Sequence, residues 1–572
     1  MSASAETIPI VTARSTPELF VERSARLTRS RTLVATVLAL LIVAGFALRV
    51  NHLGAEGLSE DELNKLHAVE DYRTRGLTAT NGEHPMLMKA IMTVSLVAAD
   101  WWNAAGLAAQ HPSLRISPEA ALRFPGTLFG AFIALLIFLV ASELFGTEVG
   151  LIAAALWALD PSGISFNRVA KEDTFLLFFF LLANIFWLRG QRVAESRSGR
   201  PEPYYWAAGA AFGAMIASKY MPHFLAISAS YYHIFQGIPA TRWRLGKVRW
   251  LIFFAFMGAT FLVCNPTILL PATWHEMRVF AGEHRIGHDS YEFMGKLYGN
   301  QLTLWFKGVP WYFYFVFIGV KLPLPVVVSF LAGLPLLFRK RLGDGRFLLL
   351  FWMMYFFMPF SAIGGKYTRY FTMALPVVLI TAAIGIQTIT QLFARLVNSL
   401  FESEAAASAL RAGLVSLVLT ASLVASIGAA PYYRLYTNAL GGAIAEVGTF
   451  FPHDEFYDAS MREVVAQIGL NARAGARVAS ESPALVAYYA QRAGRSDLVP
   501  VSLSDREAVK GLSEGDVIIL ARGRRYFSND QLTTRLQETA TPTAAFALGA
   551  VPSARIYILD RVALELIRDV VN

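Results

Sequence analysis

The residues best suited to do chemistry are two adjacent carboxylates, Asp61 and Glu62, which lie shortly after the apolar segment 33–50. Glu83 and His84 follow in the same polar stretch. A carboxylate within hydrogen-bond reach of a hydroxyl group can accept its proton as the hydroxyl oxygen attacks. Because carboxylates are poor anchors where a helix leaves a bilayer, this placement favours acid/base catalysis at the membrane face. The alternative is a solvated acidic loop in which Asp61 caps a short helix.

A second charged cluster lies in a short turn between two apolar segments. It contains Arg168, Lys171, Glu172 and Asp173. If this turn shares a cleft with Asp61, then Arg168 or Lys171 can bind a phosphate and Asp173 can orient it. The alternative is the ordinary charge found at helix ends.

Basic residues also stand at the predicted outer ends of the apolar segments. They are Arg123, Lys219, Lys321, Lys366 and Arg369. Positive charge is normally depleted on the outer side of a membrane protein. Snorkelling explains any one of these side chains, but the full set favours an anionic ligand at the membrane face.

A histidine pair lies in the later polar loop 274–308. His284 and His288 have a spacing with which two histidines on a helix can chelate a divalent cation. The glycines beside them oppose a regular helix, so contact with a substrate is the favoured interpretation. The alternative is that the two histidines bind a divalent cation. The sequence does not indicate a complete set of metal ligands or any other cofactor.

The composition places these residues in a membrane protein. The chain has 572 residues, of which 55% are hydrophobic and 16% charged, and its mean hydropathy is +0.44. These values exclude an ordinary soluble globular protein. Basic residues in cytoplasmic loops are sufficient to explain the net charge of +9, so we expect no nucleic-acid partner. The single cysteine, Cys264, excludes an internal disulfide and a cysteine metal cluster.

The apolar segments predict about eleven membrane spans. They lie near 33–50, 121–143, 149–166, 174–189, 204–218, 222–236, 250–270, 322–338, 346–360, 371–394 and 412–430. With the N-terminus inside, the basic clusters 189–200, 242–249 and 339–346 all fall on the inner side, as cytoplasmic loops should. This count requires the apolar segment 86–110 to be an interfacial helix on the outer face, and it leaves the aromatic stretch 310–320 ambiguous.

The chain divides into three predicted parts. Residues 1–32 form a cytoplasmic tail, and residues 33–430 form the membrane domain, with a first outer loop at 51–120. From 431 to 572 the hydrophobic runs become short. Strands are predicted at 475–480, 515–520 and 554–559, and helices at 460–468 and 483–493. We therefore expect a soluble α/β domain, which an odd number of spans places outside the cell.

Taken together, these motifs resemble those of the GT-C glycosyltransferases, most closely family 39. This group includes the protein O-mannosyltransferases, and the aminoarabinose transferases are close relatives. The similar motifs, in chain order, are Asp61-Glu62, Gly82-Glu83-His84-Pro85 with Lys89, Leu122-Arg123-Phe124-Pro125, Phe166-Asn167-Arg168 with Asp173, Val320-Lys321-Leu322-Pro323, and Arg369-Tyr370. The second proline of the mannosyltransferase His-Pro-Pro motif is replaced by Met86, and the eukaryotic trefoil domain is absent.

The resemblance implies an inverting transfer of a hexose or pentose from a polyprenyl-phosphate donor to an extracytoplasmic hydroxyl group. The acceptor is a protein Ser or Thr, or an envelope glycolipid or polysaccharide, in a bacterial or archaeal plasma membrane. Asp61 is the implied base, with Glu62 and Glu83 as further catalytic residues. The expected donor-phosphate ligands are Arg123, Arg168, Lys219, Lys321, Lys366 and Arg369. The expected substrate contacts are His84, Lys89, Asp173, His284 and His288.

Two other functions fit a chain of this kind. A transporter or flippase of lipid-linked sugars should carry charges at the membrane midplane and an inverted repeat, and the sequence has no visible repeat. A non-catalytic assembly protein would use the C-terminal domain and would not need the acidic and basic motifs together.

Overall fold

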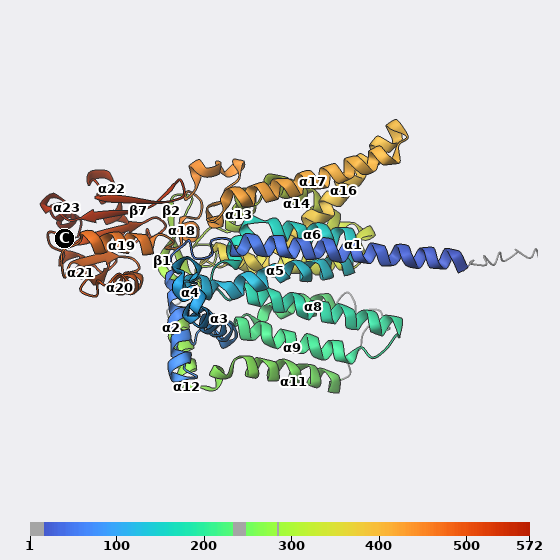
Figure 1. Cartoon of the computed structure of the whole chain (residues 1–572), viewed down its shortest axis with the longest axis horizontal. Helices are drawn as coiled ribbons and strands as arrows, with labels where there is room; N and C mark the ends of the chain where they lie inside the picture. Colours follow the sequence, from blue (N-terminus) through green and yellow to red (C-terminus); the bar gives the residue numbers. More distant parts are fainter. Residues whose placement is uncertain (1–16, 233–246, 283–284, 572) are drawn as a thin grey trace, which may run out of the picture.

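The computed structural model describes residues 17–232, 247–282 and 285–571. Long helices run side by side along the molecule and form a bundle, and a domain with a β-sheet lies at one end of it (Figure 1). Between these two parts, α2 (Glu60–Arg75) lies across the end of the bundle. The fold class predicted from the sequence, a polytopic helical membrane protein with a C-terminal α/β domain, is confirmed.

The bundle is built from apolar helices. Its longer members are α1 (Pro17–Val50), α5 (Pro118–Phe145), α8 (Asp173–Ser196), α9 (Glu202–Ser218), α11 (Lys247–Cys264), α15 (Gly345–Ala362), α16 (Leu375–Phe401) and α17 (Glu404–Ala429). Shorter members are α6 (Thr147–Leu159), α7 (Pro161–Asn167), α10 (Leu225–Ser230), α13 (Phe313–Lys321) and α14 (Leu324–Gly333).

The number of spans differs from the predicted count. Among the described residues, six helices are long and apolar enough to cross a membrane, and α6 with α7, bent by 63°, makes a seventh. Two more apolar helices, Val248–Cys264 and Leu324–Phe338, are shorter. The segment predicted at 222–236 begins with a 3₁₀ turn and α10 and then runs beyond the described residues. The count of about eleven stays a prediction.

Small residues let the helices approach closely. A side-chain carbon at Gly333 of α14 would lie 2.1 Å from the Thr381 carbonyl oxygen of α16. One at Gly385 of α16 would lie 2.0 Å from the Ser329 carbonyl oxygen. The two glycines therefore permit backbone-to-backbone packing. Within a membrane such close van der Waals contact holds helices together, because the hydrophobic effect contributes little there.

The polar connections form a layer between the bundle and the sheet domain. This layer contains α2, α4 (Gly106–Gln110), α12 (Pro271–Gly282) and the antiparallel hairpin of β1 (Arg285–Phe293) and β2 (Lys296–Gln301). The helix α3 (Met86–Ala104) also packs here against α5 and α2. It is not among the described helices that are long and apolar enough to span a membrane, and the interfacial helix expected at 86–110 stays a prediction.

The C-terminal domain contains a five-stranded sheet with the order β4-β3-β5-β7-β6. The strands are β3 (Arg477–Ser480), β4 (Val499–Ser502), β5 (Val517–Ala521), β6 (Ala544–Leu548) and β7 (Val551–Ile558). Strands β3, β4 and β5 are parallel, whereas β7 is antiparallel to both of its neighbours. The accompanying helices are α18 (Pro452–Phe456), α19 (Met461–Asn471), α20 (Pro483–Arg492), α21 (Arg506–Lys510), α22 (Asp530–Thr539) and α23 (Arg561–Val571).

Candidate active site

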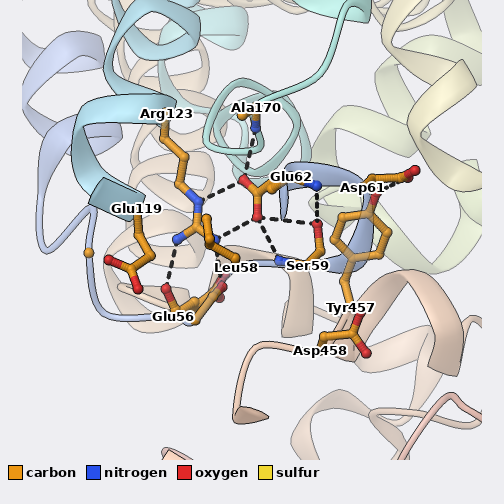
Figure 2. A network of polar contacts seen from close by, with 12 residues as sticks. Glu56, Leu58, Ser59, Asp61, Glu62, Glu119, Arg123, Ala170, Tyr457 and Asp458 are labelled. Carbon is orange, nitrogen blue, oxygen red and sulfur yellow. Dashed lines mark hydrogen bonds and ion pairs between the residues drawn. The ribbon is translucent and has the colours of Figure 1, made fainter. Parts of the chain in front are cut away.

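The start of α2 fixes the position of the acidic pair. The Ser59 hydroxyl accepts a hydrogen bond from the Glu62 backbone N–H, and the Glu62 carboxylate accepts one from the Ser59 backbone N–H. This reciprocal capping box satisfies two N–H groups that the first turn of a helix leaves without partners. Asp61, one position earlier on α2, points away from this network (Figure 2).

Glu62 and Arg123 form a buried, bidentate ion pair (Figure 2). Arg123 Nε lies 2.8 Å from Glu62 Oε1, and Nη2 lies 2.7 Å from Oε2. Arg123 also donates to the carbonyl oxygens of Glu56 and Gly57, and the Ala170 N–H donates to Glu62. Burial raises the pKa of Glu62, but Arg123 and the two backbone donors outweigh it and bring this pKa to about 2. The pair joins α2, α5 and the turn after α7.

Asp61 lies beside two cations instead. Its Oδ2 atom is 2.6 Å from Lys171 Nζ and 3.7 Å from Arg369 Nη2, and it accepts a hydrogen bond of 2.6 Å from the Tyr457 hydroxyl. Its side chain is 36% exposed. Partial burial raises the pKa of Asp61, but Lys171, Arg369 and the Tyr457 hydroxyl outweigh it and hold this pKa well below its usual range. Asp61 is therefore a carboxylate, able to accept a proton.

Two cavities meet at these cations. The larger cavity, of about 320 Å³, contains Asp61 and is lined by polar groups of α2, the β1–β2 hairpin and the C-terminal domain. The smaller cavity, of about 50 Å³, is lined by Lys321, Arg434 and aromatic rings that include Phe166 and Phe317. Lys171, Arg369 and Tyr457 line both cavities. The three partners of Asp61 therefore form the wall that the two cavities share.

His84 belongs to a buried charged network beside Asp61. Glu172 Oε1 lies 2.7 Å from Lys65 Nζ and 3.3 Å from His84 Nδ1. Burial lowers the pKa of His84 well below its usual value, so this imidazole is neutral at pH 7. Glu83 accepts a hydrogen bond from the Asn81 amide and, with His84, lines the larger cavity.

Lys89 holds the loop that carries these residues. Its ammonium group donates to the carbonyl oxygens of Asn81 (2.7 Å) and His84 (3.0 Å), and burial lowers its pKa to about 7. Lys89 does not line either cavity.

The three lysines among the predicted phosphate ligands also have carboxylate or carbonyl partners. Lys219 Nζ lies 2.6 Å from Asp173 Oδ1; Lys219 lines the larger cavity and Asp173 the smaller. Lys321 pairs with Glu455 and donates to the Tyr436 carbonyl oxygen at 2.7 Å. Lys366 donates to backbone carbonyl oxygens, and burial lowers its pKa to about 8. It lies outside both cavities.

Arg168 lies against the carboxyl end of α1. Its guanidinium donates to the carbonyl oxygens of Arg49, Asn51 and His52, at 2.7, 2.7 and 3.1 Å, and lies over the Tyr433 ring. These are carbonyl groups that a helix end leaves without intrahelical partners. Arg168, like Arg123 and Glu62, does not line either cavity.

His288 lies in the wall of the larger cavity. It stacks on the Tyr526 ring, with centroids 4.0 Å apart, and its Nε2 atom lies 2.8 Å from Arg524 Nη1 and 3.4 Å from Glu60 Oε2. Its proposed metal-binding partner, His284, lies outside the described residues. Within the parts of the chain that are described, no group of three His, Cys, Asp or Glu side chains has metal-binding geometry.

Two site residues from the C-terminal part of the chain were missed at the sequence level. Tyr457 donates to Asp61, and Arg524 forms a bidentate pair with Asp458 while it lines the larger cavity. Tyr457 follows the short helix α18, and Arg524 follows the carboxyl end of β5. The position of Arg524 was a usable signal, because ligands bind beyond the carboxyl ends of parallel strands.

Comparison with known proteins gives one match to a family and several to solved structures. Residues 107–269 match the family described as dolichyl-phosphate-mannose-protein mannosyltransferase. No curated protein matches the chain in sequence.

Among solved structures, the oligosaccharyltransferase of Archaeoglobus fulgidus in its apo form superposes with a TM-score of 0.50. It is 11% identical, over 85% of this chain and 69% of that one. The ArnT protein of Cupriavidus metallidurans, solved with undecaprenyl phosphate, gives a TM-score of 0.49 at 14% identity over 93% of this chain and 99% of that one.

The likeness at this low identity concerns the fold. The segment that matches the family contains Arg123 and the turn from Arg168 to Asp173, which are among the motifs that carried the sequence resemblance. The chain therefore has the membrane fold of the GT-C glycosyltransferases, and the resemblance to the family 39 type is confirmed over residues 107–269.

Proposed function

We propose that this chain transfers a sugar from a polyprenyl-phosphate donor to an extracytoplasmic hydroxyl group, with Asp61 as the base. The observation that carries this proposal is the position of Asp61. Its ionised carboxylate lies in the larger cavity, against two cations that also line the smaller one. The family matched by residues 107–269 is named for a sugar linked to dolichyl phosphate, which supports a donor of this class.

In this proposal the donor phosphate binds at the shared wall. Lys171 and Arg369 neutralise its charge, and the smaller cavity also contains Lys321, paired with Glu455, and Arg434, paired with Glu56. The phosphate is the leaving group, and its negative charge grows as the bond from the sugar carbon to the phosphate oxygen breaks. Cations held in place before the reaction stabilise that charge without reorganisation.

The acceptor hydroxyl then lies in the larger cavity beside Asp61. The hydroxyl proton passes to an Asp61 oxygen atom as the acceptor oxygen bonds to the anomeric carbon, and the polyprenyl phosphate departs with the electron pair of the broken bond. Attack from the face opposite the phosphate inverts the anomeric configuration. The transition state has the oxocarbenium character known from glycoside hydrolysis.

Donor binding also changes the base. Before donor binds, Lys171 and Arg369 keep Asp61 a weak base. When the phosphate attracts the same two cations, their hold on Asp61 weakens and the pKa of Asp61 rises toward its ordinary range. Asp61 thus becomes more basic only in the donor complex, where a base is needed.

The buried pair of Glu62 and Arg123 has a positioning role in this scheme. It fixes the first turn of α2, and with it Asp61, against the turn that carries Lys171. Arg168, on the carbonyl groups at the end of α1, holds the other side of that turn. Glu83 and the neutral imidazole of His84 face the larger cavity as substrate contacts.

The direct test is transfer of label from radioactive polyprenyl-phosphate sugars to crude envelope acceptor. We expect transfer by the purified wild type and a loss of about 100-fold or more for Asp61→Asn. Asp71→Asn is the matched control, because Asp71 lies on α2 but pairs with Arg75 outside both cavities. Full activity of a folded Asp61→Asn variant would contradict the base assignment. No transfer from any donor by folded wild type would contradict the function.

A further inference from the structure

A third cavity lies within the C-terminal domain. It has a volume of about 550 Å³ and lies between strands β5 and β7 and helix α22, with β1 and the segment before α18 at its edge. No predicted site residue lines it. Its walls carry three arginines, Arg522, Arg525 and Arg555, and one glutamate, Glu292.

Two of these arginines form no ion pair among the described residues, although Arg522 acts on Glu292 from a longer distance. Arg525 pairs with Asp530 and lies 3.4 Å from Glu292, so its charge is compensated. Arg522 and Arg555 have no carboxylate within ion-pair distance among residues 17–232, 247–282 and 285–571. Arg522 lies against the ring of Phe456, which fixes its guanidinium at the cavity wall. The cavity therefore has excess positive charge.

The pairing of the strands places these cations together. Arg555 of β7 lies opposite Leu520 of β5, and the Arg522 backbone N–H donates to the Ser553 carbonyl oxygen. Because side chains alternate along a strand, Ser553 and Arg555 share one face of the sheet. Ser553 is only 3% exposed, and its hydroxyl has no hydrogen-bond partner in the described residues. A buried hydroxyl without a partner is costly, and a ligand in the cavity would supply one.

The remaining lining indicates the class of ligand. Thr533, Thr534 and Gln537 of α22 face the cavity with hydroxyl and amide groups, and no aromatic ring is among its lining residues. Such a surface can bind many hydroxyl groups and an anion but offers no ring on which a nucleobase could stack.

The cavity lies back to back with the one that contains Asp61. Pro452 and Gly523 line the C-terminal cavity, whereas the next residues, His453 and Arg524, line the larger cavity of the site. The two segments cross at Gly523, where a side-chain carbon would lie 2.3 Å from the Pro452 carbonyl oxygen. A chain bound in the C-terminal cavity would therefore be held next to the acceptor side of the site.

We infer that this cavity is a binding site for an anionic saccharide, which docks the acceptor through a unit other than the one that receives the sugar. Arg522 and Arg555 bind the carboxylate or phosphate of that unit, and Ser553, Thr534 and Gln537 bind its hydroxyl groups. The site itself is independent of catalysis, and its role in docking rests on the proposed transferase function.

The test is equilibrium binding of trigalacturonate to the full-length protein in detergent, with maltotriose as the neutral probe and inorganic phosphate as the free anion. We expect trigalacturonate to bind, maltotriose not to bind, and phosphate to compete only at much higher concentration. The variant Arg522→Gln/Arg555→Gln should weaken trigalacturonate binding by about tenfold or more. Arg561→Gln, at an exposed side chain of α23, is the matched control and should leave binding unchanged.

Each other outcome would overturn the proposal. Absence of trigalacturonate binding, or equal binding to the double variant, would exclude the site. Equal losses in Arg561→Gln would show attraction to surface charge in general, and phosphate binding as tight as trigalacturonate binding would leave an anion site without sugar recognition. Because Arg522 packs on Phe456, Arg555→Gln alone repeats the test on an exposed side chain.

The same measurement on Asp61→Asn separates this inference from the proposed function. Trigalacturonate should bind this variant as tightly as the wild type. If the wild type binds trigalacturonate but transfers no sugar, the transferase function is contradicted and the saccharide site is retained. If it transfers sugar but does not bind trigalacturonate, the saccharide site is contradicted and the transferase function is retained.

Discussion

At the scale of single residues, Asp61 and Glu62 show how adjacent carboxylates acquire different chemistry. Consecutive side chains on a helix point in different directions. Glu62 is buried and held by the planar fork of Arg123, whereas Asp61 faces a cavity and the two cations Lys171 and Arg369. The first arrangement fixes a position, and the second leaves a carboxylate that can exchange its partners.

The pH dependence of transfer should report the cations around Asp61. The pKa of Asp61 in the free protein is well below its usual value. The value of kcat/KM should therefore stay constant as pH falls to about 5. The acid limb of the kcat profile should lie at higher pH than that of kcat/KM. In the donor complex the phosphate attracts Lys171 and Arg369, and the pKa of Asp61 rises. Rate profiles measured against pH test this order, and a kcat limb below that of kcat/KM would contradict it.

Lys171→Met should shift the same profile. Removal of the nearest cation raises the pKa of Asp61, so the acid limb of kcat/KM should move to higher pH. Lys510→Met, on the exposed helix α21, is the control and should leave the profile unchanged. An unmoved limb in Lys171→Met would show that Asp61 does not control the rate.

Glu62→Gln should act on stability first. It leaves the Arg123 charge buried without its partner, which costs about 3–5 kcal/mol at pH 7. Because the folded-state pKa of about 2 is below the unfolded value, the contribution of Glu62 is complete above about pH 5 and is lost as pH falls toward 2. Chemical unfolding of both proteins across this pH range should show the difference shrink. A constant difference would contradict this account.

The sequence predicted site residues where a charged side chain stands at an unusual place, next to a membrane span. Asp61, Lys171 and Arg369 drew attention because ionisable groups are rare at membrane spans, and the structure brings the three together. The same reasoning also selected Arg168 and Lys366, which bind backbone carbonyl oxygens. Residue type and spacing do not distinguish a cation that binds a ligand from one that binds the ends of helices.

At the scale of elements, the N-cap of α2 links local helix formation to the site. Ser59→Ala removes one half of the capping box and should cost about 1 kcal/mol of stability. Because the first turn of α2 carries Asp61, we also expect kcat to fall. Ser403→Ala, at the N-cap of α17, should cost similar stability with unchanged kcat. Unfolding and transfer assays of both variants test this. A kcat of Ser59→Ala equal to that of the wild type would exclude a link between the N-cap and the rate of transfer.

The elements themselves were predicted with uneven success. The sequence located β3, β5, β7, α19 and α20, whose buried residues form continuous or periodic apolar patterns. It missed β4 and β6, which lie at the two edges of the sheet and are only partly buried, so they carry no clear apolar pattern. In the bundle, helices such as α9 and α11 follow the predicted segments but are too short to decide the span count.

At the scale of the whole molecule, the C-terminal domain completes a site whose proposed base, Asp61, lies near the N-terminus. Tyr457→Phe removes the hydroxyl that donates to Asp61 and should lower kcat by about tenfold. It should also raise the acid limb of kcat/KM, because that hydrogen bond helps to lower the pKa of Asp61. Tyr488→Phe, on α20 outside both cavities, is the control. Unchanged kinetics in Tyr457→Phe would exclude a contribution of this contact.

This contact across the molecule has a consequence for biosynthesis. Asp61 and Tyr457 are 396 positions apart, and a ribosome completes the helices of the bundle, the last of which ends at Ala429, before it makes the tyrosine. A nascent chain thus carries Asp61, Lys171 and Arg369 before it has the Tyr457 hydroxyl and the C-terminal residues that line the two cavities. The arrangement around Asp61 is complete only after the C-terminal domain has been made and has folded against the membrane part. Premature termination anywhere before Tyr457 would leave Asp61 without this hydrogen bond, and under the proposed function such a chain would transfer less sugar.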